Sequence, residues 1–309
     1  MSQTRFITKE YLDVFQRLFP DRHCLECILS YFQPALLKDI HPHPRDKRIK
    51  FYDEVLLDGE MEPRYHLYIV DGDPNSYISS TTFIHSFFEH FDADAVISNM
   101  MRGRNWQTSP YFGMTPDQIK NQWEENRDQA ARKGTAMHLN LEHFYNGIPV
   151  DTEFLSTKEW EQFQRYLQKH RYIDTDGKEY DLQPHLTEAV IFDEEHKVTG
   201  SVDWLGIDPK RPGYLILKDW KRSKEIKWYG FKRGQEPLTH LYDCNGMHYT
   251  LQASLYRWIL ERNYGVKISG MFLVRFHPDA DDFEEIRVGY LKDEIEAMMA
   301  HRLAQLKGK

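Results

Sequence analysis

Three charged residues lie inside two short apolar segments that have the character of strands. Asp203 is part of GSVDWL, and Asp219 and Lys221 end the run LILKDWK. Burying a charge is costly unless the charge is paired or binds a metal, and the turn between the segments would accept these residues at no cost. Asp219 and Lys221 share a face with the two leucines of their run, because side chains alternate along a strand. If the two segments pair as antiparallel strands, both carboxylates and the lysine converge at the rim of a core.

The acid-x-lysine spacing alone is not specific. Three further triplets, Asp176-Gly-Lys178, Glu195-His-Lys197 and Asp208-Pro-Lys210, lie in turn-like segments, where exposure to solvent explains them. Asp219 and Lys221 differ because they end an apolar strand. A structural ion pair at a strand end is the alternative interpretation of these two residues.

Two predicted helices carry polar residues four positions apart, a spacing that places them on one helical face. His138 and Glu142 belong to GTAMHLNLEHF, and Gln252 and Tyr256 belong to LQASLY. Either pattern is also typical of an ordinary amphipathic helix, in which Tyr256 would be a core residue.

The order of the elements predicts how these residues are positioned. A helix begins at Thr115-Pro116, a capping residue followed by proline, and runs on to FYNG with Gly134 as a candidate break. After a second helix at 157–170 come three strands, a helix closed by Gly265, two strands and a final helix. This order predicts an α/β fold with a central mixed sheet flanked by helices.

The first 110 residues have a different pattern. Two helical stretches, YLDVFQRLF and HCLECILSYF, stop at the prolines of HPHP, and KFYDEVLL and RYHLYIV predict a hairpin. The segment YISSTTFIHSFFEHF then changes from strand to helix, and MRGRNWQTSPYFG has loop character. No linker separates these residues from the rest. We therefore expect a helical and hairpin extension over 1–110, packed on a core of 111–309.

Together these segments resemble one nuclease superfamily. The order GTAMHLNLE, TEAVIF, GSVDWL, LILKDWK and LQASLY is similar to the PD-(D/E)XK nucleases, in particular the RecB-like exonuclease branch that includes the mitochondrial genome maintenance exonuclease and, more distantly, lambda exonuclease. The resemblance covers about residues 130–260, and YISSTTFIHSFFEHFDAD also resembles segments ahead of such domains in large DNA viruses. Two positions depart from the superfamily pattern: Val202 replaces its proline, and Asp219 stands where many members have glutamate.

The resemblance implies a restriction-endonuclease-like core that holds one or two Mg²⁺ or Mn²⁺ ions. Asp203 and Asp219 would supply hard oxygen ligands, and His138 as a ligand would favour Mn²⁺. Lys221 would orient or help to deprotonate the attacking water. The catalytic set is thus Lys221, Asp219 and Asp203. The further candidate ligands are the backbone carbonyl of Trp220 and the carboxylates of Glu188 and Glu142.

A basic and aromatic stretch follows the catalytic strand. KRSKEIKWYGFKR interleaves cations with rings, a composition that binds the backbone and bases of single strands, although a solvated loop with anchoring aromatics would look the same. By resemblance, Gln252 and Tyr256 would face the same groove. The predicted substrate contacts are therefore Gln252, Tyr256, Arg222, Lys224, Lys227 and Trp228. Arg102, Arg104 and Trp106 form a weaker cluster of the same kind.

The predicted function is that of a metal-dependent DNA nuclease, an exonuclease that prefers single-stranded DNA or DNA ends. Two alternatives stay open at this point. One is an RNA endonuclease on the same fold. The other is a catalytically inactive nucleic-acid-binding protein, against which the intact set of Asp203, Asp219 and Lys221 argues.

Composition sets outer limits on these predictions. The chain of 309 residues has a net charge of −8, which argues against a surface generally coated with nucleic acid and leaves room for a local basic groove. No apolar run approaches the roughly 20 residues of a membrane span, and the N-terminus resembles neither a signal nor a transit peptide. We expect an intracellular protein of the cytoplasm, nucleus or a viral factory, with no membrane partner.

The cysteines indicate a reducing compartment. Only Cys24, Cys27 and Cys244 are present, without a paired framework. Some RecB-like relatives hold an iron–sulfur cluster with four cysteines, so we expect no such cluster here. A zinc site built from Cys24 and Cys27 with nearby histidines, His23, His41 and His43, is a minor alternative.

Overall fold

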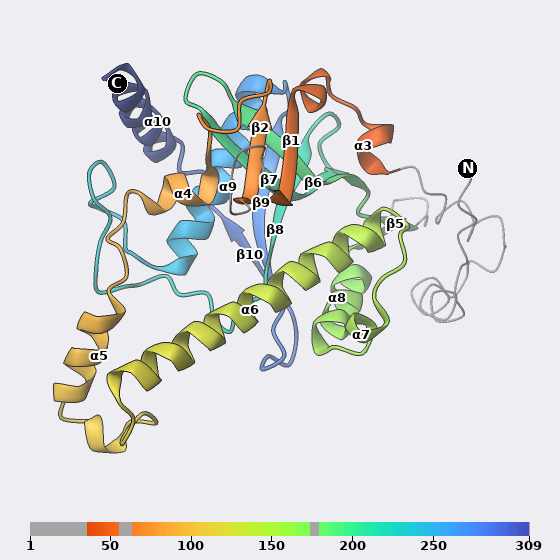
Figure 1. The fold of residues 1–309 in the computed structure, drawn as a ribbon. Coiled ribbons are helices and arrows are strands. Elements are labelled where there is room, and N and C mark those ends of the chain that lie inside the picture. Colours follow the sequence, from red (N-terminus) through yellow and green to blue (C-terminus); the bar gives the residue numbers. More distant parts are fainter. Residues whose placement is uncertain (1–35, 56–63, 174–178, 309) are drawn as a thin grey trace.

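The computed structural model describes residues 36–55, 64–173 and 179–308 (Figure 1). Its centre is a six-stranded sheet of order β10-β9-β8-β7-β3, in which β6 pairs with β7. The strands are β3 (Ile78–Ser79), β6 (Pro184–Asp193), β7 (Val198–Ile207), β8 (Leu215–Lys221), β9 (Ile268–Arg275) and β10 (Glu284–Val288). Two pairs, β3–β7 and β8–β9, are parallel and the other three are antiparallel. The predicted α/β fold with a mixed sheet is confirmed.

Helices cover both faces of this sheet (Figure 1). The helices α4 (Ser80–His85), α9 (Asn245–Asn263) and α10 (Lys292–Lys307) pack on one face, in a core layer that includes Leu217 of β8. The helices α6 (Pro116–Tyr145) and α8 (Lys158–Lys169) pack on the other, in a layer that includes Trp220 of β8. The short helix α7 (Thr152–Leu155) precedes α8. Alternate residues of β8 therefore enter opposite core layers, as strand geometry requires.

The long helix α6 begins where the sequence predicts. Thr115 and Gln118 form a reciprocal capping box, and Pro116 occupies the first turn. The helix spans 30 residues in all and passes through Gly134 without interruption, so the candidate break at this glycine is absent. Good helix formers surround this glycine, and its intrinsic cost of about 1 kcal/mol is too small to end the helix.

A short helix, α5 (Ala93–Arg102), was not expected from the sequence. Asp92 caps its first turn, and the pair between Lys120 and Asp94, 3.0 Å apart, joins α5 to the start of α6. The single turn η2 (Trp106–Thr108) follows. The stretch that the sequence assigned to a loop therefore begins inside α5.

The N-terminal segment packs on the sheet and also contributes to it. It contains α3 (Leu37–Ile40), η1 (Pro44–Arg48) and the predicted hairpin of β1 (Ile49–Val55) with β2 (Arg64–Val70). Ile49 and Val70 of the hairpin bury Phe192 of β6. Because β3 belongs to the central sheet and α4 packs on α9, residue 110 does not mark a break in the fold. The two helical stretches predicted before HPHP lie outside the described residues.

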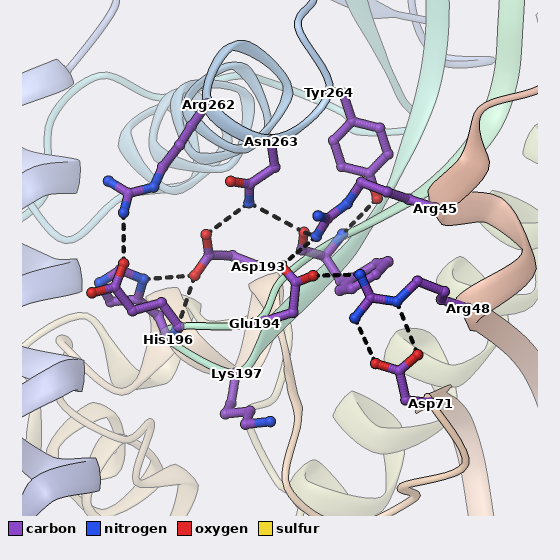
Figure 2. A network of polar contacts seen from close by, with 12 residues as sticks. Arg45, Arg48, Asp71, Asp193, Glu194, His196, Lys197, Arg262, Asn263 and Tyr264 are labelled. Carbon is purple, nitrogen blue, oxygen red and sulfur yellow. Dashed lines mark hydrogen bonds and ion pairs between the residues drawn. The ribbon is translucent and has the colours of Figure 1, made fainter.

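A polar network fixes the turn between β6 and β7 (Figure 2). Glu194 in this turn binds Arg45 and Arg48 of η1, and the Arg48 contact is 2.7 Å long. The side chain of Asn263, at the end of α9, donates to Asp193 at 2.7 Å. The turn is thus tied to the N-terminal segment on one side and to α9 on the other.

The middle of β8 also carries a buried lysine. Lys218 is 2% exposed, and its ammonium contacts the Tyr166 hydroxyl at 2.6 Å and Glu285 at 2.7 Å. His170 lies 3.1 Å from the other carboxylate oxygen of Glu285. Burial lowers the pKa of Lys218 to about 8 despite the attraction of Glu285. Burial also opposes ionisation of Glu285, but His170 and Lys218 outweigh it and lower the pKa of this carboxyl to about 2.

Two elements complete the description. A small hairpin, β4 (Arg171–Ile173) with β5 (Glu179–Asp181), follows α8. In the described ranges of the chain, no helix is both long and apolar enough to cross a membrane.

Candidate metal centre and active site

Asp203 and Asp219 lie opposite each other where β7 and β8 separate. The last paired residues of the two strands are Trp204 and Lys218, and the next step of this antiparallel register faces Asp203 with Asp219. Both aspartates are buried, with Asp219 only 1% exposed. The convergence that strand alternation predicts is therefore present in the structure.

A backbone amide orients the carboxylate of Asp203. Its Oδ2 atom accepts a hydrogen bond from the N–H of Trp220 at 2.7 Å. The indole of Trp220 is itself buried in the core layer beneath α6 and α8. With Oδ2 held in this way, Oδ1 faces His138 of α6, whose Nδ1 atom is 3.6 Å away.

His138, Glu188 and Asp203 form a compact group of potential ligands, with ligand atoms all within 4.8 Å of one another. The Nδ1 atom of His138 is 3.4 Å from Oε1 of Glu188, and the hydroxyl of Ser201 donates to Oε2 at 2.9 Å. Of the two acidic residues proposed only as further ligands, Glu188 is thus inside the group. Glu142 is half-buried one turn further along α6 and is outside it.

The backbone of Glu188 is strained. Its φ of +46° lies in the left-handed region, which costs a residue with a side chain about 1–3 kcal/mol. Its neighbours Thr187 and Ala189 pair with Trp204 and Val202, so Glu188 stands opposite Asp203. The strain is therefore located where β6 presents a carboxylate to the candidate centre.

Asp219 is a buried carboxylate without a hydrogen-bond donor among the described residues. The ammonium of Lys221 lies 2.6 Å from its Oδ2 atom, but the approach falls outside hydrogen-bond geometry. Lys221 is therefore the ion partner that offsets the loss of water by this buried carboxylate. Asp203, Glu188 and the imidazole of His138 form a donor set that fits Mg²⁺ or Mn²⁺, and Asp219 lies beside Asp203 but outside this compact group.

The charges of the site are strongly coupled. Burial, reinforced by Asp219, raises the pKa of Asp203 to about 8. Burial opposes protonation of His138, but Asp203 and Glu188 outweigh it and raise the pKa of this imidazole to about 9. Burial likewise opposes the charge on Lys221, yet Asp219 and Asp203 raise its pKa. The raised pKa values of Asp203 and His138 reflect carboxylates crowded at one point, a repulsion that a bound divalent cation would relieve.

A chain of hydrogen bonds positions Lys221. Its ammonium donates to Oε1 of Gln252 at 3.1 Å and lies 4.5 Å from the centre of the Tyr249 ring. The amide of Gln252 donates to the hydroxyl of Tyr256 at 2.9 Å, and that hydroxyl is 3.0 Å from the hydroxyl of Ser80. The lysine is therefore connected through α9 to the first residue of α4.

Tyr256 has a different role from the predicted one. It is 3% exposed and belongs to the core layer between the sheet and α9, so it does not reach a substrate. Gly200 leaves room for its ring, since a Cβ atom there would lie 2.4 Å from it. Tyr256 is a positioning residue, as is Ser80, which no sequence signal identified. Gln252, half-buried beside Lys221, reaches the rim of the site.

Arg222, predicted to bind substrate, instead forms a buried ion pair. Its Nε atom donates to Glu159 of α8 at 2.8 Å, and the two side chains are 10% and 8% exposed. Breaking such a pair would leave an uncompensated buried charge. The structure therefore gives Arg222 a structural role.

The remaining predicted substrate contacts lie on the surface. Lys224 is 3.2 Å from Asp279 and Lys227 is 3.8 Å from Glu225, both as exposed pairs of little energetic weight. Trp228 is partly exposed beside Lys227. These residues extend from the end of β8 towards α9.

The other acid-x-lysine triplets lie in turns where the structure describes them, but Asp208 is buried and not exposed to solvent as predicted. Asp208 accepts a hydrogen bond from the amide of Lys210 at 2.8 Å, and Glu195 pairs with Arg262 at the surface at 2.6 Å. Asp176-Gly-Lys178 lies outside the described residues, as do Cys24 and Cys27. His41 packs on His185 with ring centres 4.1 Å apart, and His43 caps η1.

Comparisons with known proteins add little to this geometry. No protein-family model matches the chain, and no curated protein matches it. Among solved structures, one similar chain is the crystal structure of SSO0001, at 16% identity, 75% coverage of this chain and 77% of the other, with a TM-score of 0.29. A likeness at this level carries no argument about function.

Proposed function

We propose that the protein is a metal-dependent deoxyribonuclease of the RecB-like type, built on a restriction-endonuclease-like core. The observation that carries the proposal is the convergence of two buried carboxylates, Asp203 and Asp219, with the ammonium of Lys221 at the end of the β7–β8 pairing. Alternatives based on an ordinary ion pair do not account for the additional His138 and Glu188 at the same point. A structural ion pair with Lys221 would need one carboxylate, whereas the carboxylates of Asp203, Asp219 and Glu188 all lie in this region.

The proposed reaction is hydrolysis of a phosphodiester bond. A bound Mg²⁺ or Mn²⁺ ion would act as a Lewis acid on the phosphate oxygens. Asp203, Asp219, Glu188 and His138 would hold this ion, with the Asp203 carboxylate oriented by the Trp220 amide. Lys221, held by Gln252 and Tyr249, would orient the attacking water and, as an ammonium, favour the loss of the water's proton to solvent.

The choice of DNA rests on the family resemblance of the sequence. The preference for single strands or ends is supported by the same resemblance and by the basic, aromatic segment after β8. An RNA endonuclease would use the same metal chemistry, so the substrate must be tested directly.

The deciding experiment is digestion of end-labelled oligonucleotides by the purified protein. Single-stranded DNA, duplex DNA and RNA of matched sequence would be incubated with Mg²⁺, with Mn²⁺ and with EDTA. We expect cleavage of single-stranded DNA in at least one of the two ions and none in EDTA, with shortening from the ends. Asp219→Ala serves as the inactive control. Intact DNA in both ions would refute the proposal, and cleavage of RNA alone would establish the alternative.

A further inference from the structure

The segment between β8 and α9, residues 222–244, presents three aromatic rings to solvent. Trp228 is 40% exposed, Tyr229 61% and Phe231 99%. We refer to these three residues as the aromatic platform. A cluster of exposed rings is unfavourable in water and marks a surface that contacts another molecule.

The platform is held rigidly. On one side, the amide of Lys227 donates to the side chain of Asn245 at 2.7 Å. On the other, the amide of Asp243 donates to the carbonyl of Lys232 at 2.9 Å. Between them, Gly230 is pressed against the backbone, since a Cβ atom there would lie 2.1 Å from the Asp243 oxygen. The rings are therefore displayed from a fixed backbone.

Further ring contacts support the exposed side chains. The rings of Tyr229 and Tyr242 have centres 4.7 Å apart, and those of Tyr229 and Phe231 are 6.0 Å apart. The guanidinium of Arg233 lies 4.1 Å from the centre of the Tyr242 ring. Tyr229, Phe231 and Tyr242 therefore form one aromatic cluster backed by a cation.

One residue of the platform, Trp228, lies at the start of α9, the helix that also carries Gln252 of the candidate active site. Trp228 packs on the first turn of this helix, because a Cβ atom on Gly246 would be 2.8 Å from its ring. Gln252, which binds Lys221, is six residues further on, about 9 Å along the helix axis. Trp228 and the residue that contacts Lys221 are therefore less than two helical turns apart on α9.

The charge of the segment indicates the chemistry of its partner. Around the platform the exposed cations are Lys224, Lys227, Lys232 and Arg233, whereas Lys221 and Arg222 are held in the ion pairs described above. Exposed cations beside flat rings fit a polyanion that also offers flat apolar faces, which is an unpaired nucleic-acid strand. A duplex keeps its base faces stacked inside and offers only the phosphates.

We propose that the aromatic platform stacks the unpaired bases of the nucleic-acid strand whose phosphate is cleaved at Asp203 and Asp219, with Phe231 as the principal stacking residue. The proposal rests on the proposed function and adds a determinant of single-strand preference. Such stacking depends on the bases and not on the phosphates.

The test measures binding apart from cleavage. Full-length wild type and Phe231→Ala would be titrated in EDTA with fluorescein-labelled oligothymidylate, with an abasic oligomer of equal length and with a blunt duplex. We expect Phe231→Ala to bind oligothymidylate about tenfold more weakly and the abasic oligomer and duplex unchanged. Phe112→Ala, which removes another exposed ring (56% exposed), is the matched control and should bind like wild type.

Equal binding of oligothymidylate by wild type and Phe231→Ala would overturn the stacking proposal, and so would a wild type that binds no oligonucleotide. A protein that self-associates through Phe231, seen as a change in mass by light scattering with unchanged binding, would overturn it as well. The proposed function is judged separately, by metal-dependent cleavage with wild type. If Phe231→Ala binds and cleaves like wild type, the stacking proposal is wrong and the proposed nuclease function is retained.

Discussion

The hydroxyl of Ser80 lies 3.0 Å from the hydroxyl of Tyr256, and this contact connects the N-terminal segment to the lysine of the candidate site. Ser80 is 2% exposed and precedes Lys221 by more than a hundred residues, so only the folded chain brings them together. The contact makes Ser80 a positioning residue for the proposed reaction.

Ser80→Ala should therefore lower kcat by about tenfold or less and leave KM unchanged, because it removes one buried hydrogen bond behind Lys221. Steady-state cleavage of a labelled oligonucleotide measures both constants. The control is Ser79→Ala, which removes the side-chain cap of α4 and should lower the free energy of unfolding by about 1 kcal/mol. Ser79 is not part of the hydrogen-bond chain from Ser80 to Lys221. Equal losses of kcat in the two variants would show that Ser80 acts through stability alone.

Asp219→Ala should abolish binding of Mn²⁺ as well as cleavage. The substitution removes one of the two buried carboxylates that face each other at the end of β7 and β8, and under the proposed function this carboxylate is a metal ligand. Isothermal titration with Mn²⁺ measures the loss directly. Retention of wild-type affinity by Asp219→Ala would place the ion elsewhere.

Lys221→Ala separates catalysis from metal binding. Removing a positioned acid or base costs on the order of 10² to 10⁴ in rate, while the metal ligands stay in place. Titration should therefore show Mn²⁺ affinity equal to or slightly above that of wild type, because a like charge has left the site. Lys210→Ala, in the turn of Asp208, is the control and should cleave normally. The strand register would be in error if Lys210→Ala were inactive and Lys221→Ala active.

Stability at acid pH should depend on Glu285. Its pKa of about 2 lies below the ordinary 4.5, so between these values the folded state binds fewer protons than the unfolded state. Its contribution is present above pH 4.5 and is lost as the pH falls to 2, on the order of 3 kcal/mol in total. Urea unfolding across this range should show a shallower pH slope for Glu285→Gln.

At neutral pH, Glu285→Gln should also be less stable than wild type by about 3–5 kcal/mol, since it leaves the charge of Lys218 buried without its partner. Glu284→Gln is the neighbouring control. Its side chain is 48% exposed and pairs with Arg275 at the surface, so its loss should cost little. An unchanged acid slope in Glu285→Gln would assign the acid lability to other groups.

Local rules of sequence predicted much of the fold and the centre of the site. Alternation in LILKDWK placed Asp219 and Lys221 on one face, and the short connection to GSVDWL placed Asp203 opposite. The capping signal at Thr115 located the start of α6. These features depend on residues that are near in sequence or on neighbouring strands.

What the sequence did not predict depends on distant contacts. The left-handed backbone of Glu188 arises where β6 pairs with β7. The residue types of this segment do not predict that conformation. Arg222 looked like a surface cation because Glu159, its partner, comes from α8. Tyr256 looked like a substrate contact because its burial depends on Gly200 and Ser80 from other elements.

Lys218, on the opposite face of β8 from Asp219 and Lys221, helps to determine the register in which this strand pairs. Lys218 enters one core layer while Asp219 and Lys221 face the other side of the sheet. A shift of β8 by one residue would exchange the two faces, carry Trp220 into the polar centre and drive unpaired charges into both apolar layers. A shifted register therefore raises the free energy of the folded state on both faces of the sheet. The charged residues proposed to perform the chemistry thus also help to fix the register of β8.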